Sequence, residues 1–161
     1  MRKVVVNSTP IISLSIINKL DLLSKIYKEI YVPQAVYDEV SVTGKSKIGA
    51  NLLKKAKFIN VVPVKNDTAR KFFSTSLHKG EVEVMILAKE IEANLVIIDD
   101  YQARKHAKYL GINLTGTLGV LLRAKEEGLI NEIRPLLDEL INNDIYIDNG
   151  LYEKVLQMAG E

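Results

Sequence analysis

The stretch 94-NLVIIDDYQAR-104 places four consecutive apolar residues directly before two aspartates. A short continuous apolar run such as Leu95–Ile98 predicts a strand buried on both faces, as in a parallel sheet covered by helices. Burial of this strand carries Asp99 and Asp100 to the edge of the core, where the strand ends. Ligands bind at the carboxyl ends of parallel strands, so the two carboxylates indicate a site at this edge.

The rest of the chain alternates in the same way between short β-rich runs and longer segments with helical spacing. Strands are expected at residues 3–6, 29–32, 58–64, 95–98 and 112–114, with a minor strand at 144–147. Helices are expected at residues 11–26, 33–40, 80–93, 101–111, 117–128, 132–143 and 150–160. This alternation predicts an α/β domain with a mainly parallel sheet and helices on both faces.

Composition limits the class of protein and of site. The 161 residues suffice for one domain, expected to span residues 1–161, and 26% of them are charged, as in a globular protein. The chain has no cysteine and only two histidines, which excludes disulfides and makes oxygen atoms the expected ligands of any metal. The net charge of +2 does not identify a nucleic-acid partner by itself. Without an apolar run long enough for a signal peptide or a membrane span, a cytoplasmic protein is expected.

Further polar residues are expected at the same edge of the sheet. Asn7 follows the first strand as Asp99 follows the fourth. Glu81 opens a helix directly after Gly80 and shares its apolar side, whereas Glu83 is expected to face water. Glu39, on the helix after the second strand, is a weaker candidate for the same edge.

Several carboxylates at one edge raise one another's pKa and destabilise the fold unless a cation neutralises them. Mg²⁺ or Mn²⁺ prefers oxygen ligands of this kind, so a divalent-cation site is the sharper hypothesis. Each residue also has a simpler interpretation. An aspartate at position 99 or 100 can cap the next helix, and Asp100 can pair with Arg104. Glu81 can complement its helix dipole.

Four blocks of the sequence resemble the PIN-domain nuclease superfamily, which includes the VapC-type toxins of prokaryotic toxin–antitoxin pairs. They read VVVNSTPIISLSIINKLDLL, KGEVEVMILAKE, IIDDYQARKHAKYLGI and TGTLGVLLRAKEEGLI, and they extend over essentially the whole chain. The nearer similarity is to a subgroup of short prokaryotic PIN-like proteins. The resemblance implies a three-layer α/β/α sandwich around a central, mainly parallel sheet.

The resemblance also implies Mg²⁺- or Mn²⁺-dependent hydrolysis of single-stranded or structured RNA. Its metal ligands fall on Asn7, Glu39, Glu81 and Asp99, with Asp100 as a further carboxylate, and catalysis rests on Glu39, Glu81 and Asp99. Ser8, Thr115, Thr117 and Arg104 are implied substrate or hydroxyl contacts; for the two threonines, capping and turn formation around Gly116 are an equal alternative. The implied partners are RNA, an antitoxin protein and a second copy of the chain.

The first strand is followed by Asn7, where the superfamily usually has aspartate. An amide oxygen can bind a cation but adds no charge, so a PIN fold that binds RNA or protein without cleavage is the main alternative. A phosphate-accepting receiver-like domain also clusters aspartates at strand ends. That third interpretation fits less well, because its acidic pair should follow the first strand.

Overall fold

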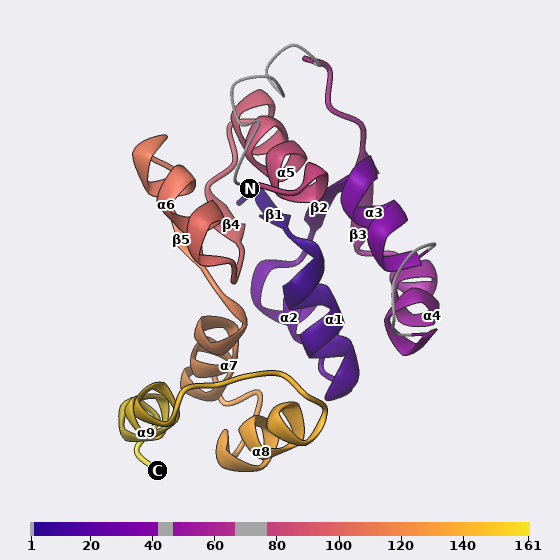
Figure 1. Ribbon diagram of the computed structural model, residues 1–161. Coiled ribbons are helices and arrows are strands. Elements are labelled where there is room, and N and C mark those ends of the chain that lie inside the picture. Colours follow the sequence, from indigo (N-terminus) through magenta and orange to yellow (C-terminus); the bar gives the residue numbers. More distant parts are fainter. Residues whose placement is uncertain (1, 42–46, 67–76) are drawn as a thin grey trace.

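The computed structural model describes residues 2–41, 47–66 and 77–161. In these ranges, five short strands form one parallel sheet in the order β3-β2-β1-β4-β5 (Figure 1). The strands are β1 (Val4–Val6), β2 (Ile30–Pro33), β3 (Ile59–Val62), β4 (Leu95–Ile97) and β5 (Leu114–Thr115). The expected sheet is confirmed, and every pairing between neighbouring strands is parallel.

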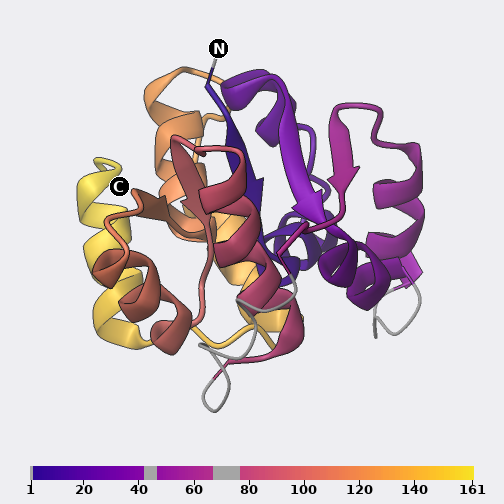
Figure 2. The ribbon, with the colours of Figure 1, turned by 90° about the horizontal axis from the view of Figure 1, so that it is seen from above.

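Helices connect the strands and extend beyond the last one. They are α1 (Ser8–Ile16), α2 (Leu22–Tyr27), α3 (Gln34–Ser41), α4 (Lys47–Lys55), α5 (Lys79–Glu90), α6 (Tyr101–Tyr109), α7 (Thr117–Glu126), α8 (Arg134–Asn142) and α9 (Asn149–Met158). Helix α5 packs on β1, β2 and β4, whereas α2 contacts β2 and α7, and α7 contacts β5 and α9. Helices therefore cover both faces of the sheet, as Figure 2 shows, and the α/β/α layering is confirmed.

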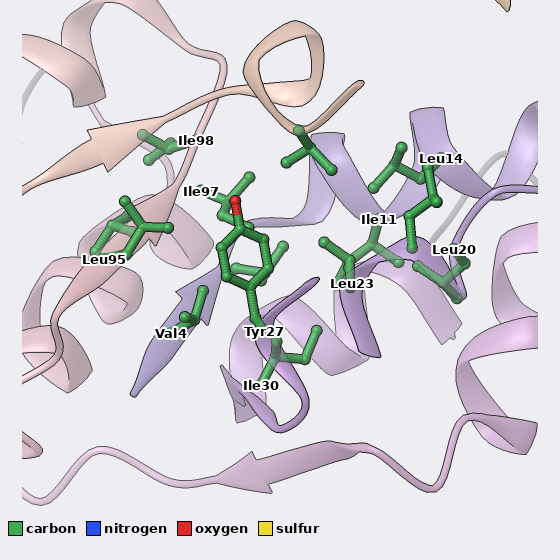
Figure 3. Close-up of a cluster of buried hydrophobic side chains, with 14 of the residues drawn as sticks. Val4, Ile11, Leu14, Leu20, Leu23, Tyr27, Ile30, Leu95, Ile97 and Ile98 are labelled. Carbon is green, nitrogen blue, oxygen red and sulfur yellow. The ribbon is translucent and has the colours of Figure 1, made fainter. Parts of the chain in front are cut away.

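The core forms around the central strand β1. Val4, Val5 and Val6 are completely buried, because β2 and β4 pair with β1 on its two sides and helices cover its two faces. Figure 3 shows Val4 surrounded by Leu95, Ile30 and Tyr27. A run of valines suits this position, since β-branched side chains fill a strand that is buried on both faces.

The single helix expected over residues 11–26 is wrong, because the chain turns between α1 and α2. Asn18 has a φ of 53°, the amide of Lys19 donates to the Leu14 carbonyl (2.7 Å), and that of Asn18 donates to Ser15 (3.0 Å). These two bonds form a Schellman motif, and asparagine tolerates its left-handed residue better than most residues do. Helical spacing persists across the turn only because both helices bury apolar residues in the same core.

Two further expectations differ from the structure. Residues 144–147 form no strand: Asp144 (φ of 64°) ends α8, the Ile145 amide donates to Leu140, and Ile145 and Ile147 pack against the core. Their alternation arises from this packing and not from strand pairing. Helix α4 was not predicted; it packs on α1 and α3 through the buried Leu53. Within the described part of the chain, no helix has the length and apolarity that crossing a bilayer requires.

The strand order fixes where a site can form. The chain moves outward from β1 to β2 and β3, and then returns to the other side of β1 with β4 and β5. The carboxyl ends of β1 and β4 therefore flank the topological switch point, where ligands bind in open α/β sheets. Asn7 directly follows β1, and Asp99 and Asp100 follow β4 after Ile98.

The carboxylate of Glu161 holds the end of the chain against the α7–α8 region. It accepts bonds from Lys125 Nζ (2.8 Å) and from the amides of Ile133 (2.7 Å) and Arg134 (3.1 Å), at the start of α8. Desolvation acts to raise the pKa of this carboxyl, but the hydrogen bonds outweigh it and lower the pKa to about 2. Glu161 thereby caps α8 and ties it to α7 and α9.

Replacement of Glu161 by glutamine is expected to lower the free energy of unfolding at pH 7 by about 1–2 kcal/mol, because charge-assisted bonds are lost. Since the folded-state pKa is lowered, the stabilisation is present above the unfolded pKa and disappears as the pH falls towards 2. Urea unfolding at pH 7 and pH 3 measures both effects. Glu153→Gln, an exposed site on α9, is the matched control and should leave stability unchanged; an equal loss in both variants would contradict this role of Glu161.

Candidate functional site

Asn7 lies at the centre of the carboxyl edge. Its backbone N–H donates to the Ile97 carbonyl of β4 (2.9 Å), and this bond continues the pairing of β1 with β4 past the last residue of β1. The side chain is 3% exposed, and its Oδ1 is buried with no hydrogen-bond partner. A buried amide oxygen without a partner is costly, because it has lost water without replacing it. Asn7 therefore offers an unused acceptor to a ligand.

Glu39 and Gly80 approach this acceptor from two other elements. A Cβ atom on Gly80 would lie 2.7 Å from Glu39 Oε2 and 3.9 Å from Asn7 Oδ1. Glycine at position 80 is thus the residue that lets α5 come close to α3 and to the end of β1 without displacing the glutamate. A pocket of about 390 Å³ opens here and is lined by Ala35, Asp38, Glu39, His78, Lys79 and Gly80.

Glu81, the residue after Gly80, carries a buried carboxylate in the first turn of α5. Its Oε1 accepts a bond from the amide of His78 (3.0 Å), which satisfies one free donor at the start of α5. Its Oε2 is buried and has no hydrogen-bond partner. Desolvation by burial raises the pKa of Glu81, the His78 amide opposes this, and the nearby Asp100 carboxyl raises it further. The helix-dipole interpretation of Glu81 therefore explains only one of its two oxygen atoms.

The two aspartates after β4 have different surroundings. Asp100 caps α6 by accepting from the Ala103 amide (2.8 Å), and it is also the carboxyl that raises the pKa of Glu81. Asp99 accepts from the Thr117 amide (2.8 Å) and hydroxyl (2.6 Å), so it fixes the start of α7. Asp99 faces Gly116, where a Cβ would lie 2.6 Å from its Oδ1. Of the two, Asp100 is the one that faces Glu81.

The expectation that Glu83 faces water is wrong. Glu83 is 2% exposed, and its Oε1 accepts from the Ala35 amide (3.0 Å) in the first turn of α3. Helix α5 is covered on nearly every side: all residues from Gly80 to Ala88 are buried. A one-faced helical pattern cannot describe such a helix, and the spacing of residues along the chain does not indicate that α3 supplies a donor.

The remaining predicted contacts are placed as follows. Ser8 is buried in the first turn of α1, next to Asn7, and Thr115 ends β5 opposite Ile97. Arg104 donates from Nη1 to the Ile98 carbonyl (3.0 Å), and among the described residues its expected ion pair with Asp100 does not form. Arg104 thus secures the turn after β4.

The geometry brings together only part of the predicted metal site. Asn7 and Glu39 come together beside Gly80, and Asp100 lies near the Glu81 carboxylate, whereas Asp99 accepts bonds from Thr117 at both of its oxygens. Across residues 2–41, 47–66 and 77–161, no three Asp, Glu or His side chains are arranged as a ready site for one ion. The donors at the edge are nevertheless all oxygen atoms, and two of them are buried without partners, which fits Mg²⁺ or Mn²⁺ in donor type.

Comparison with known protein families identifies the fold and its family. Residues 3–161 match the family described as DUF3368: PIN domain. The chain belongs to this PIN-domain family. A solved structure of a PilT N-terminus domain protein from the hyperthermophilic archaeon Sulfolobus solfataricus P2 is similar, with a TM-score of 0.58 and 18% sequence identity.

The alignment with that archaeal structure covers 76% of this chain and 92% of the other. At 18% identity, this similarity shows that the two proteins share a fold. Comparison with curated proteins finds no match. The PIN fold accounts for the five-stranded parallel sheet flanked by helices.

Substitution of the two buried glutamates on α5 of this PIN domain should change the free energy of unfolding in opposite directions. In a chelator at pH 7, Glu81→Gln is expected to increase the free energy of unfolding, because the charge at position 81 is desolvated and Oε2 has no partner. Glu83→Gln is expected to decrease it by about 1 kcal/mol, because the amide oxygen of glutamine accepts the bond from the Ala35 amide less strongly than a carboxylate does.

The pH dependence checks the cause of the Glu81 effect. A raised folded-state pKa means that ionisation costs stability as the pH rises above the unfolded value, about 4.3. The stability gained through Glu81→Gln should therefore shrink as the pH falls towards 4, because a protonated Glu81 is uncharged like the glutamine that replaces it. Denaturant unfolding at several pH values measures it, and a gain that did not change with pH would contradict the explanation.

Proposed function

We propose that this protein is a divalent-cation-dependent ribonuclease that hydrolyses RNA phosphodiester bonds at the carboxyl edge of its PIN fold. The proposal rests on one observation above all. Asn7 Oδ1 and Glu81 Oε2 are buried without partners at the switch point of the sheet. PIN domains are commonly nucleases, which agrees with such a site.

In this proposal, the chain's own residues hold and orient the reacting groups. Glu81 supplies a carboxylate and Asn7 an amide oxygen, while Glu39 approaches from α3 and orients the attacking water or shares in binding the ion. Mg²⁺ or Mn²⁺ bound there supplies charge for the phosphate and lowers the pKa of water. The raised pKa of Glu81 falls when a cation compensates its charge, so ion binding and ionisation of Glu81 favour each other.

Asp100 is the better-placed fourth carboxylate, and Asp99 acts as a positioning residue. Asp100 interacts with Glu81 and begins α6. Both oxygens of Asp99 receive bonds from Thr117, which makes this aspartate part of the support for α7. In this proposal, Asp99 is therefore not a metal ligand and Thr117 is not a substrate contact. The bonds between these two residues instead hold the end of β4 and the start of α7 together.

A second function is favoured by Asn7 itself. Without a charge at the end of β1, the site attracts a cation less strongly than a site with aspartate there. A PIN fold that binds RNA or a protein without cleaving RNA is the function that this substitution supports. The toxin role, the antitoxin partner and the homodimer stay predictions that rest on the family resemblance.

The ion-binding part of the proposal is tested by adding Mn²⁺ or Mg²⁺ to the chelated protein. The ion is expected to raise the thermal midpoint of the parent and to permit cleavage of a labelled RNA. Glu81→Gln and Asp100→Asn should lose both responses, whereas Glu139→Gln, at an exposed site on α8, should keep both. Asp99→Asn should be less stable with or without the ion, because Thr117 loses a charged acceptor. Cleavage that persists in Glu81→Gln would overturn the proposal.

Asn7→Asp separates the two candidate functions. In a chelator this variant should be less stable than the parent, because it adds a buried charge beside Glu81. With Mn²⁺ it should show the larger rise in thermal midpoint and faster cleavage. Thermal shift and a gel assay of RNA cleavage measure both. Cleavage in the variant and none in the parent would support the non-cleaving module, and an ion response smaller than the parent's would argue against a cation next to residue 7.

A further inference from the structure

The exposed face of α6 combines two tyrosines with two lysines. The side chains of Tyr101 and Tyr109 are 69% and 91% exposed, and Lys105 and Lys108 are exposed between them. With 100° per residue, these four residues fall within an arc of about 100°, opposite the buried Ala103 and Ala107. We call these four residues the tyrosine–lysine face.

The charge on this helix has one sign. Residues 101–109 include Arg104, Lys105 and Lys108 and contain no aspartate or glutamate. Lys105 Nζ lies 5.6 Å from the centre of the Tyr101 ring, so the cation and the ring share one surface. On a chain whose net charge is only +2, this is a local concentration of positive charge with aromatic rings.

The position of α6 links this face to the carboxyl edge. Asp100, which contacts Glu81, is the N-cap of α6, and Tyr101 is the first residue of the helix. Tyr101 and Tyr109 are eight residues apart, which corresponds to about 12 Å along a helix. Figure 1 shows α6 leading away from the end of β4. A strand bound along the face would therefore have one end beside the candidate site.

We propose that the tyrosine–lysine face binds single-stranded RNA and directs it towards the carboxyl edge; the choice of RNA rests on the proposed function. Bases stack on Tyr101 and Tyr109, and phosphates pair with Lys105 and Lys108. Sequence-independent sites for single strands combine these two features: aromatic rings for bases and cations for the backbone.

The chemistry of the face favours an unpaired strand over other partners. A duplex keeps its bases stacked on one another and offers no free base surface to Tyr101 or Tyr109. The core of a stable protein interface is depleted of charged residues, whereas two of the four residues of this face are lysines. Phosphate groups complement the lysines, and bases complement the rings.

Binding of the full-length protein to a fluorescein-labelled ten-nucleotide oligouridine, measured by anisotropy in EDTA, tests the inference. Without divalent ions no cleavage occurs under the proposed mechanism, so binding is measured alone. Tyr101→Ala and Tyr109→Ala are each expected to raise Kd about 5-fold to 150-fold, and Tyr109→Phe should bind like the parent because its ring still stacks. Lys105→Gln and Lys108→Gln should each reduce the slope of log K against log salt by about 0.7. All are exposed positions, where substitution leaves folding intact.

Lys154→Gln, at an exposed site on α9, is the control for charge and should retain the parent's salt slope. Unchanged Kd in both alanine variants, equal slopes for Lys105→Gln and Lys154→Gln, or equally tight binding of an RNA duplex would each overturn the inference. Failure of the nuclease proposal has a different signature: the tyrosine variants would still weaken binding, but no divalent ion would produce cleavage.

Discussion

The parallel pairing of β1 with β4 at the centre of the sheet is the interaction on which the candidate site depends. Val6 is opposite Ile97, and the Asn7 amide donates to the Ile97 carbonyl. This pairing brings two strands that are about ninety residues apart in sequence to one edge, and it places Asn7 and Asp100 near each other. Because Val4, Val5 and Val6 are completely buried, a shift of one residue would put a flanking polar residue, Lys3 or Asn7, in the place of a valine. Hydrophobic packing therefore fixes the position of the polar residues beyond the strand ends.

Two glutamates on α5 show how surroundings decide what a buried carboxylate does. Glu83 accepts an amide of α3 and so contributes to packing, whereas Glu81 has one oxygen without a partner and a raised pKa. Unsatisfied polar groups in native proteins are concentrated where ligands bind, and a pocket opens beside Glu39 and Gly80, the residue that precedes Glu81. In the proposed function, a cation beside Glu81 would compensate its desolvated charge.

The proposed chemistry and the proposed binding of RNA use opposite charges on adjoining elements. The carboxyl edge is acidic and suits an ion, and α6, which starts from Asp100, presents lysines and tyrosines to the solvent. Uncompensated carboxylates repel the phosphates of an RNA strand. Lysines next to the site would offset this repulsion as the strand binds. Asn7 lowers the negative charge at the edge relative to aspartate. In the proposed function, the residue at the end of β1 therefore sets the balance between binding an ion and binding a strand.

The sequence by itself determined the parallel α/β class, most of the strands and the edge where Asn7 and Asp100 lie, because continuous apolar runs and the residues after them are local features. It did not determine the turn at Asn18, the burial of Glu83 or the separate roles of the two aspartates. These depend on contacts between distant segments: Asp99 finds its partner at Thr117, and Glu83 finds its partner at Ala35. Tertiary structure alone decided which buried carboxylate oxygens have a hydrogen-bond partner and which do not, since hydrogen-bond satisfaction is a property of three-dimensional neighbours and not of spacing along the chain.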